Sequence, residues 1–231
     1  MAEYSERVGK IFEDIDKEVK NCYDIANKAK ALGFDPDKSV KIPLARNMAE
    51  RVEGLISSVA PEILGKGVSE RIQELEKKYG SQDWRVALVI AEEVAKEKFC
   101  KFESKKKAME IGIRTGFSYV TVGVVSSPLE GFIGIDIRKR ADGQEYFALV
   151  YGGPIRSAGG TGASVSVLIA DYVRKKMGYA TYDATEKEVK RAYTELCDYH
   201  ERVTNLQYFP SEEEVTFLVN HLPVQLDGDP S

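Results

Sequence analysis

A stretch of sixteen residues, Leu149–Ser164, constrains the fold more than any other part of this sequence, because it holds five glycines and one proline. The glycines are Gly152, Gly153, Gly159, Gly160 and Gly162. A β-prone run precedes the stretch and a mostly apolar run follows it, so the pattern predicts a strand, a glycine-rich loop and a helix. Glycine at this density indicates a backbone with positive φ, or one that a phosphate, a nucleic acid or a neighbouring helix approaches closely.

The loop does not match the phosphate-binding loops that have a fixed motif. A P-loop ends in Gly-Lys-Ser or Gly-Lys-Thr, whereas this loop ends Gly160-Thr161-Gly162-Ala163-Ser164 and has no lysine. A dinucleotide fingerprint requires a βαβ unit, but the strands before the loop have the pattern of a hairpin. The glycine-rich loop of the GHMP small-molecule kinases is superficially similar, although Arg156 interrupts that pattern. Two interpretations stay open, namely contact with a phosphate or nucleic acid, and close packing of the helix on the sheet.

Amphipathic helices account for the first part of the chain. Apolar residues at spacings of three and four predict a long helix from Glu6 to Leu32, which Gly33 ends. The same spacing predicts further helices over about 47–59, 69–79, 83–94 and 104–113. An exposed stripe on the first helix would mark an interaction surface, and it includes Ile11, Phe12, Ile15, Val19 and Tyr23.

The composition changes after about residue 113. We predict extended chain over Tyr119–Val125, then two strands over Gly131–Arg140 and Glu145–Tyr151 joined by an Asp-Gly turn. Helices are expected over about 163–177 and 186–206 and from Ser211, before a last strand over Pro223–Leu226.

The predicted fold class is therefore α+β and mostly helical, with a small antiparallel sheet around 119–151 packed against helices and a long N-terminal helix. We expect a helical N-terminal layer over 1–100 and an α+β core with the hairpin and the glycine-rich loop over 101–231. The abrupt end of the sequence suggests that the two together form the N-terminal domain of a longer polypeptide.

The charge of the chain limits what it can bind. The formal net charge is −4 at pH 7, whereas a domain that grips nucleic acid unaided is expected to carry a basic face. A local basic edge is still compatible with the sequence, formed by Arg138, Arg140 and Arg156 and extended by Arg174. We predict at most weak, salt-sensitive contact with DNA through these arginines.

The residue types that carry most enzymatic chemistry are few or poorly placed. Two histidines, and three cysteines without a CxxC pair, argue against a metal cluster and indicate a reducing compartment. No Asp-x-Asp pair falls in a predicted strand, and no Ser/His/Asp or Cys/His arrangement can be recognised. We predict no catalytic residue, no metal and no cofactor in this chain. The uncharged runs are too short to span a membrane and no signal pattern begins the sequence, so we expect a cytoplasmic protein without a membrane partner.

Several long motifs resemble one family. In chain order they are Ile42-Pro43, Met48–Glu53, Ser127–Gly131, Tyr151–Thr161, Asp171–Arg174, Tyr199–Thr204 and Leu206–Tyr208. Together they resemble the N-terminal region of the large subunit of archaeal family D DNA polymerase, over about residues 40 to 228.

The resemblance implies that the chain is an accessory, architectural part of a DNA-directed DNA polymerase, which is a nucleotidyltransferase, and that it is inactive alone. In that family the polymerase active site and the zinc sites lie downstream, so Mg²⁺ and Zn²⁺ are expected for the full subunit only. The implied partners are the small subunit, which carries the exonuclease, the remainder of the large subunit, and DNA in the full complex. A homodimer through the first helix is a further expectation. The alternative is a free-standing phosphate-binding or nucleotide-binding enzyme, such as a GHMP-like small-molecule kinase.

Overall fold

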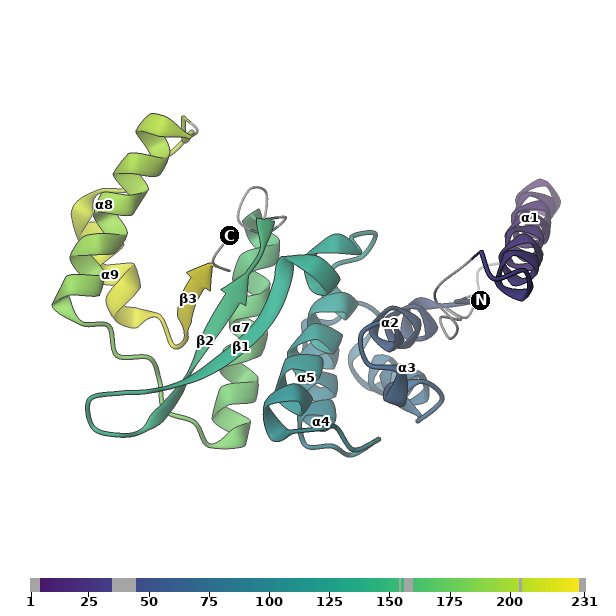
Figure 1. Cartoon of the computed structure of the whole chain (residues 1–231), viewed down its shortest axis with the longest axis horizontal. Coiled ribbons are helices and arrows are strands. Elements are labelled where there is room, and N and C mark those ends of the chain that lie inside the picture. The colour runs from purple at the N-terminus through teal and green to yellow at the C-terminus, as the bar shows by residue number, and fades with distance from the viewer. Residues whose placement is uncertain (1–4, 35–44, 154, 156–159, 204, 229–231) are drawn as a thin grey trace. The chain divides into compact units, whose positions relative to one another are not determined.

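The computed structural model describes residues 5–34, 45–153, 155, 160–203 and 205–228, and Figure 1 shows its helices and strands. The chain divides into two compact units, residues 1–41 and residues 42–231. None of the helices in the described ranges combines the length and the apolar character that a membrane span requires.

The first unit contains one long helix, α1 (Glu6–Ala31), which confirms the helix predicted there. It ends at Leu32 and Gly33, where Gly33 has a φ of +76° and its amide bonds to the carbonyl of Lys30. No residue of α1 is buried. Within its apolar stripe, Ile11 and Ile15 are each at least 50% exposed.

The second unit begins with four α-helices, three of which have a side-chain N-cap. They are α2 (Met48–Ser57), α3 (Val68–Tyr79), α4 (Trp84–Ala95) and α5 (Lys105–Val120). The side chains of Asn47, Asp83 and Ser104 accept backbone amides at the first turns of α2, α4 and α5, as N-caps do. These helices confirm the prediction that this part of the chain is helical. Helix α4, which ends before residue 100, packs on α5, which begins after it.

Two glycines on α5 allow that close packing. A Cβ atom on Gly112 would lie 2.5 Å from the carbonyl oxygen of Ala91 on α4. A Cβ atom on Gly116 would lie 2.7 Å from the carbonyl oxygen of Ala87 and 3.2 Å from Ile169. Because real Cβ atoms do not approach backbone oxygen so closely, only glycine permits α5 to pack at this distance.

The prediction of extended chain over Tyr119–Val125 is wrong at its start, because α5 continues through Tyr119 to Val120. Tyr119 is 1% exposed, and its hydroxyl donates to Glu76 Oε1 at 2.8 Å and accepts the amide of Gln82 at 2.9 Å. Burial of this face outweighs the β preference of the local residues. A short π-helical turn, η2 (Ser127–Gly131), then leads into the sheet.

The sheet has the order β1-β2-β3, with β1 (Phe132–Lys139), β2 (Glu145–Tyr151) and β3 (Gln225–Gly228). The first two strands form the predicted antiparallel hairpin, with Gly143 at a φ of +83° in its turn. The third strand pairs with β2 in parallel, so the sheet is mixed and not wholly antiparallel as predicted. The sequence pattern shows where a strand lies, but its direction depends on the helices that return the chain to the sheet.

One face of the sheet packs on helices and the other is polar. Phe147 and Leu149 are completely buried on the first face. There α7 (Gly160–Met177) contacts β2 and also packs on α4 and α5, as Figure 1 shows. The last helices, α8 (Glu186–Arg202) and α9 (Glu212–His221), pack on each other beside the β3 edge. The buried residue of α8 is Val189 and that of α9 is Val215, so this helical hairpin is held by few buried side chains.

Candidate functional site at the polar face of the sheet

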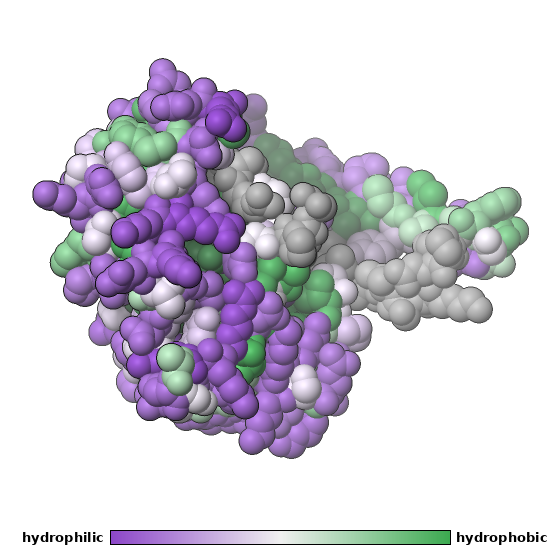
Figure 2. All heavy atoms as spheres, turned by 60° about the vertical axis from the view of Figure 1, so that its left-hand side comes forward, coloured by the Kyte–Doolittle hydropathy of each residue, from purple (hydrophilic) through white to green (hydrophobic). Residues whose placement is uncertain are grey.

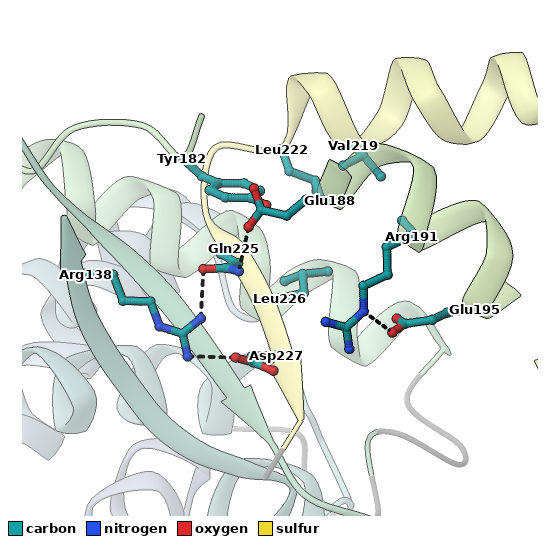
Figure 3. Close-up of a pocket in the computed structure, with 11 residues that line it drawn as sticks. Arg138, Tyr182, Glu188, Arg191, Glu195, Val219, Leu222, Gln225, Leu226 and Asp227 are labelled. Carbon is teal, nitrogen blue, oxygen red and sulfur yellow. Dashed lines mark hydrogen bonds and ion pairs between the residues drawn. The ribbon is translucent and has the colours of Figure 1, made fainter. Parts of the chain in front are cut away.

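Arg138 is the centre of a polar network on the open face of the sheet (Figure 3). It stands on β1 opposite Tyr146 of β2, and its guanidinium extends across β2 to β3. There Nη1 donates to Gln225 Oε1 at 2.9 Å and Nη2 donates to Asp227 Oδ2 at 2.6 Å. The Tyr146 hydroxyl donates to the same Gln225 oxygen at 3.0 Å. These bonds join the first and last strands of the sheet through side chains.

The electrostatic surroundings neutralise the charge of Arg138. Burial opposes the charged form, but the bond to Asp227 and the charges of Asp227 and Asp136 outweigh it and raise the pKa of Arg138. Burial also opposes the charge of Asp227, while the bond from Arg138 and the amide of Gly228 lower the pKa of that carboxyl below its usual value. A phosphate that approached Arg138 would have to displace this carboxylate.

A groove of about 470 Å³ lies between β3 and the α8–α9 hairpin. Its walls carry two arginines and three carboxylates as well as apolar side chains, including Arg138, Arg191, Glu188, Glu195, Asp227 and Leu226. Figure 3 shows the Arg191 guanidinium pointing from α8 toward β3, with its Nε bonded to Glu195 at 2.6 Å. No histidine, cysteine or serine is among the described lining residues. The groove can hold a polar segment, but it lacks a paired nucleophile and base.

Arg140 lies at the end of the hairpin and is also neutralised. Its Nη2 is 3.2 Å from Asp142 and 3.5 Å from Asp183, and its Nη1 donates to the carbonyl of Thr181 at 3.3 Å. The side chain is 23% exposed. Arg140 thereby ties the hairpin to the segment before α8. Arg138 lies near the C-terminal end of β1 and Arg140 directly after it, and their role as a basic edge that contacts DNA stays a prediction.

Arg174 does not share that edge. It is 4% exposed, and its Nε and Nη2 donate to Asp171 at 2.9 and 2.6 Å. Its Nη1 donates to the carbonyl of Tyr179 at 2.6 Å, which fastens the end of α7 to the chain beyond it. A role for Arg174 in binding DNA stays a prediction, and its burial within the described residues disfavours that role.

The glycine-rich loop is described only in part, since Arg156 and Gly159 lie outside the described residues. The amide of Gly152 bonds to the carbonyl of Gly131 at 2.8 Å, and a Cβ there would lie 3.1 Å from Ile133. Gly160 is the first residue of α7, and a Cβ atom added to Gly162 would lie 3.9 Å from the ring of Phe117, an ordinary contact distance. Added Cβ atoms on Gly153 would meet nothing within 4 Å. The contacts of Gly152 support close packing at the start of the loop.

A buried hydrogen bond connects the two ends of this loop. The hydroxyls of Tyr151, at the end of β2, and Ser166, on α7, are 2.7 Å apart. Burial raises the pKa of Tyr151 to about 12, against the opposing effect of the bond with Ser166. The phenol is therefore a neutral, structural group that fixes α7 to the sheet.

Arg114 is a positioning residue that the sequence did not reveal. It lies on α5, is 6% exposed, and donates through Nη1 to the carbonyls of Pro128 and Leu129 and through Nη2 to that of Ile133. Burial lowers its pKa, and its guanidinium lies 5.1 Å from the ring centre of Phe132. Arg114 thus holds the turn that borders Gly152. The signal that could have indicated this role in the sequence is a single arginine between mostly apolar positions of α5.

The described residues contain no group of three or more His, Cys, Asp or Glu side chains placed to bind a metal ion. His200 accepts the amide of Leu206 through Nδ1 at 3.0 Å and lies against Phe209, which is a structural role. The described arginines of the predicted basic edge are thus paired with carboxylates of the same fold.

Comparisons with known proteins give a consistent result. The sequence model of the family described as "DNA polymerase II large subunit DP2, N-terminal" matches residues 10–231. The DNA polymerase II large subunit of Nanoarchaeum equitans is 49% identical over 215 residues, which is 93% of this chain and 17% of that protein. The same subunit of Thermococcus kodakarensis is 40% identical over 228 residues, 98% of this chain and 12% of that protein. That of Methanosarcina barkeri is 40% identical over 227 residues, 98% of this chain and 19% of that protein. The chain thus spans less than a fifth of these relatives.

Proposed function

This chain belongs to the family of the N-terminal part of DNA polymerase II large subunits, and we propose that it is a non-catalytic, architectural domain of an archaeal DNA-directed DNA polymerase. The match over residues 10–231 confirms the resemblance found in the sequence motifs. It carries the proposal, because it covers nearly the whole chain and only a small share of each relative. The alternative of a free-standing small-molecule kinase has no support from these comparisons.

The absence of a metal-binding group among the described residues supports a non-catalytic role. DNA synthesis transfers a nucleotidyl group, a reaction in which bound divalent metals stabilise the charge on the phosphates. We place the active site, with its Mg²⁺ and the zinc sites expected by resemblance, in the part of the large subunit that lies outside the matched region. The proposed compartment is the cytoplasm.

DNA contact by this domain is proposed to be weak. Arg138 and Arg140 each lie within 3.5 Å of two carboxylates, so much of their charge is already compensated. The net charge of −4 acts in the same direction. Any contact through Arg138, Arg140 and Arg156 is therefore an auxiliary one, made while other parts of the polymerase hold the DNA.

We assign the main task of the domain to assembly. The exposed apolar side chains of α1, of which Ile15 is 53% and Ile25 59% exposed, are of the kind that marks a protein interface. The proposed partners are a second copy of the chain, the remainder of the large subunit and the small, exonuclease-bearing subunit.

The test is a comparison of three preparations: the complete two-subunit enzyme, the same enzyme without residues 1–231, and residues 1–231 alone. Nucleotide incorporation on primed DNA and the mass of each complex are measured. We expect the fragment to be inactive and the deleted enzyme to assemble poorly or to lose DNA affinity. A fully active and fully assembled deletion, or incorporation by the pure fragment, would contradict the proposal.

A further inference from the structure

The outer surface of α9 carries large apolar side chains that this chain leaves exposed. Phe217 is 61% exposed, Leu218 58% and Tyr208, just before the helix, 67%. Two shallow hollows of about 380 and 520 Å³ adjoin this surface, and Phe217 and Glu213 line both of them. We call Tyr208, Glu212, Glu213, Phe217 and Leu218 the outer α9 surface. Figure 2 shows a face of the molecule that is mostly hydrophilic with separate hydrophobic patches. Large apolar side chains that lie together and exposed are typical of an interaction site.

The outer α9 surface is preformed. The Tyr208 hydroxyl donates to Glu214 Oε1 at 2.7 Å, and the amide of Ser211 donates to Oε2 of the same carboxylate at 2.8 Å. These bonds lower the pKa of Glu214 below its usual value, the Tyr208 bond most of all. On the other side, the ring of Phe217 stacks on His221 with centroids 4.2 Å apart. A partner would therefore bind without ordering these groups first.

The charge at the edge of the surface is acidic. Glu212, Glu213 and Glu214 form the first turn of α9, where the helix dipole favours negative charge. Neither Glu212 nor Glu213 forms an ion pair with a described residue. Carboxylates that border apolar side chains repel a phosphate backbone and attract lysine and arginine. The complementary ligand is a polypeptide segment with bulky apolar residues flanked by basic ones.

We propose that the outer α9 surface binds a basic amphipathic segment of the large subunit itself, contributed by the part outside the region that this chain matches. This proposal rests on the proposed function. The matched region is less than a fifth of the relatives, so most of a large subunit is available to cover the surface. The α8–α9 hairpin buries one residue from each helix in this chain. Burying further apolar surface against a partner segment would therefore stabilise the hairpin.

Zero-length carbodiimide cross-linking of the full-length large subunit, read by mass spectrometry, tests the partner and its source. We expect Glu212 and Glu213 to link to lysines outside residues 1–231, within a segment that also has bulky apolar residues. Glu213→Gln should remove its link. Glu201 is the matched control, an exposed glutamate on α8 that lines neither of the two hollows, and should not link to that segment. Links only to an added small subunit, or only between copies of the chain, would overturn the proposal.

Hydroxyl-radical footprinting of the same full-length subunit covers the case in which the basic groups are arginines. Reversing both charges, Glu212→Lys with Glu213→Lys, should raise the oxidation rate of Phe217 about fivefold, because an interface residue regains access to solvent. Glu201→Lys should leave that rate unchanged. The proposal would be overturned if the double charge reversal left the oxidation rate of Phe217 unchanged and Glu212 and Glu213 formed no cross-links. DNA synthesis and assembly of the enzyme without residues 1–231 separate this failure from failure of the proposed function, because only the latter would leave both unchanged by the deletion.

Discussion

Arg138 and Asp227 lie 89 positions apart in the chain, yet the Nη2 atom of one is 2.6 Å from a carboxylate oxygen of the other. The pair joins the first strand of the sheet to the last, across the strand between them. An arginine that looked like a free basic group in the sequence is, in the fold, part of the connection that holds β3.

We expect Arg138→Met to lower the free energy of unfolding by about 1 kcal/mol, because a partly exposed ion pair and a hydrogen bond to Gln225 are lost. Asp227→Asn should act on the same pair, so a double-mutant cycle should give a coupling of roughly 0.5–1 kcal/mol. Urea unfolding of the four proteins measures it. Lys139→Met, at the exposed neighbouring position, is the control. Strict additivity would show that the pair contributes nothing.

Tyr151→Phe should change how stability depends on pH. The folded pKa of Tyr151 is raised to about 12 from its usual value near 10. Its contribution is therefore fully present below pH ~10 and is lost as the pH rises toward ~12. The difference in unfolding free energy between wild type and Tyr151→Phe should be about 1 kcal/mol at neutral pH, from the lost bond to Ser166, and should shrink above pH ~10. Urea midpoints from pH 7 to 11 test this, and a constant difference would contradict it.

Gly112→Ala should destabilise the second unit by roughly 1–3 kcal/mol, because the added methyl group meets the backbone of α4. Gly162→Ala makes the same substitution in the first turn of α7, where the nearest atom would be 3.9 Å away. It should be neutral or mildly stabilising. Thermal unfolding of both variants provides the comparison. Equal effects would show that packing against α4 does not explain the glycine on α5.

Removing the acidic partners of Arg140 should strengthen DNA binding by the complete enzyme. With Asp142→Asn and Asp183→Asn, the guanidinium is freed for a phosphate. If it makes one new phosphate contact, the slope of log affinity against log salt should steepen by about 0.9. Arg140→Gln in the same background should cancel the gain. DNA affinity at several salt concentrations decides it, and an unchanged slope would leave Arg140 with a structural role only.

Ile15→Glu on α1 should weaken self-association or subunit association more than folding. Ile15 is 53% exposed, so burying the exposed part in an interface would contribute roughly 1–1.5 kcal/mol. Light scattering at several concentrations, on the complete enzyme, measures the change. Asp14→Asn alters the charge at the adjacent position and is the control. If the assembly state of both variants equals that of the wild type, α1 is not the assembly element.

Local patterns in the sequence predicted most of the helices correctly. Thr185 and Glu188 have the spacing of a capping box, and both of its bonds are present at the start of α8. The hairpin followed from alternation and from the Asp-Gly turn, because these signals act between neighbours in the chain. The same reasoning failed at Tyr119, whose helical state depends on burial against α3.

The candidate site was less predictable, because its properties come from contacts distant in sequence. The sequence showed Arg138 and Arg140 as basic but could not show that Asp227 and Asp183 neutralise them. Arg174 has its carboxylate partner, Asp171, three positions away, but its burial comes from the packing of α7. The direction of β3 and the role of Arg114 depend in the same way on tertiary structure.

The parallel strand β3 also sets an order of events during synthesis of the chain. The hairpin of β1 and β2 and the helices before it have their partners close by and can form as the chain leaves the ribosome. Gln225 and Asp227 emerge long after Arg138, so the sheet keeps an open edge until α7, α8 and α9 have been made. During that interval β2 has an unpaired side that another strand could join. A translational pause before residues 225–228 have left the ribosome should lengthen the interval and favour misassembly, whereas a pause after they have emerged should not.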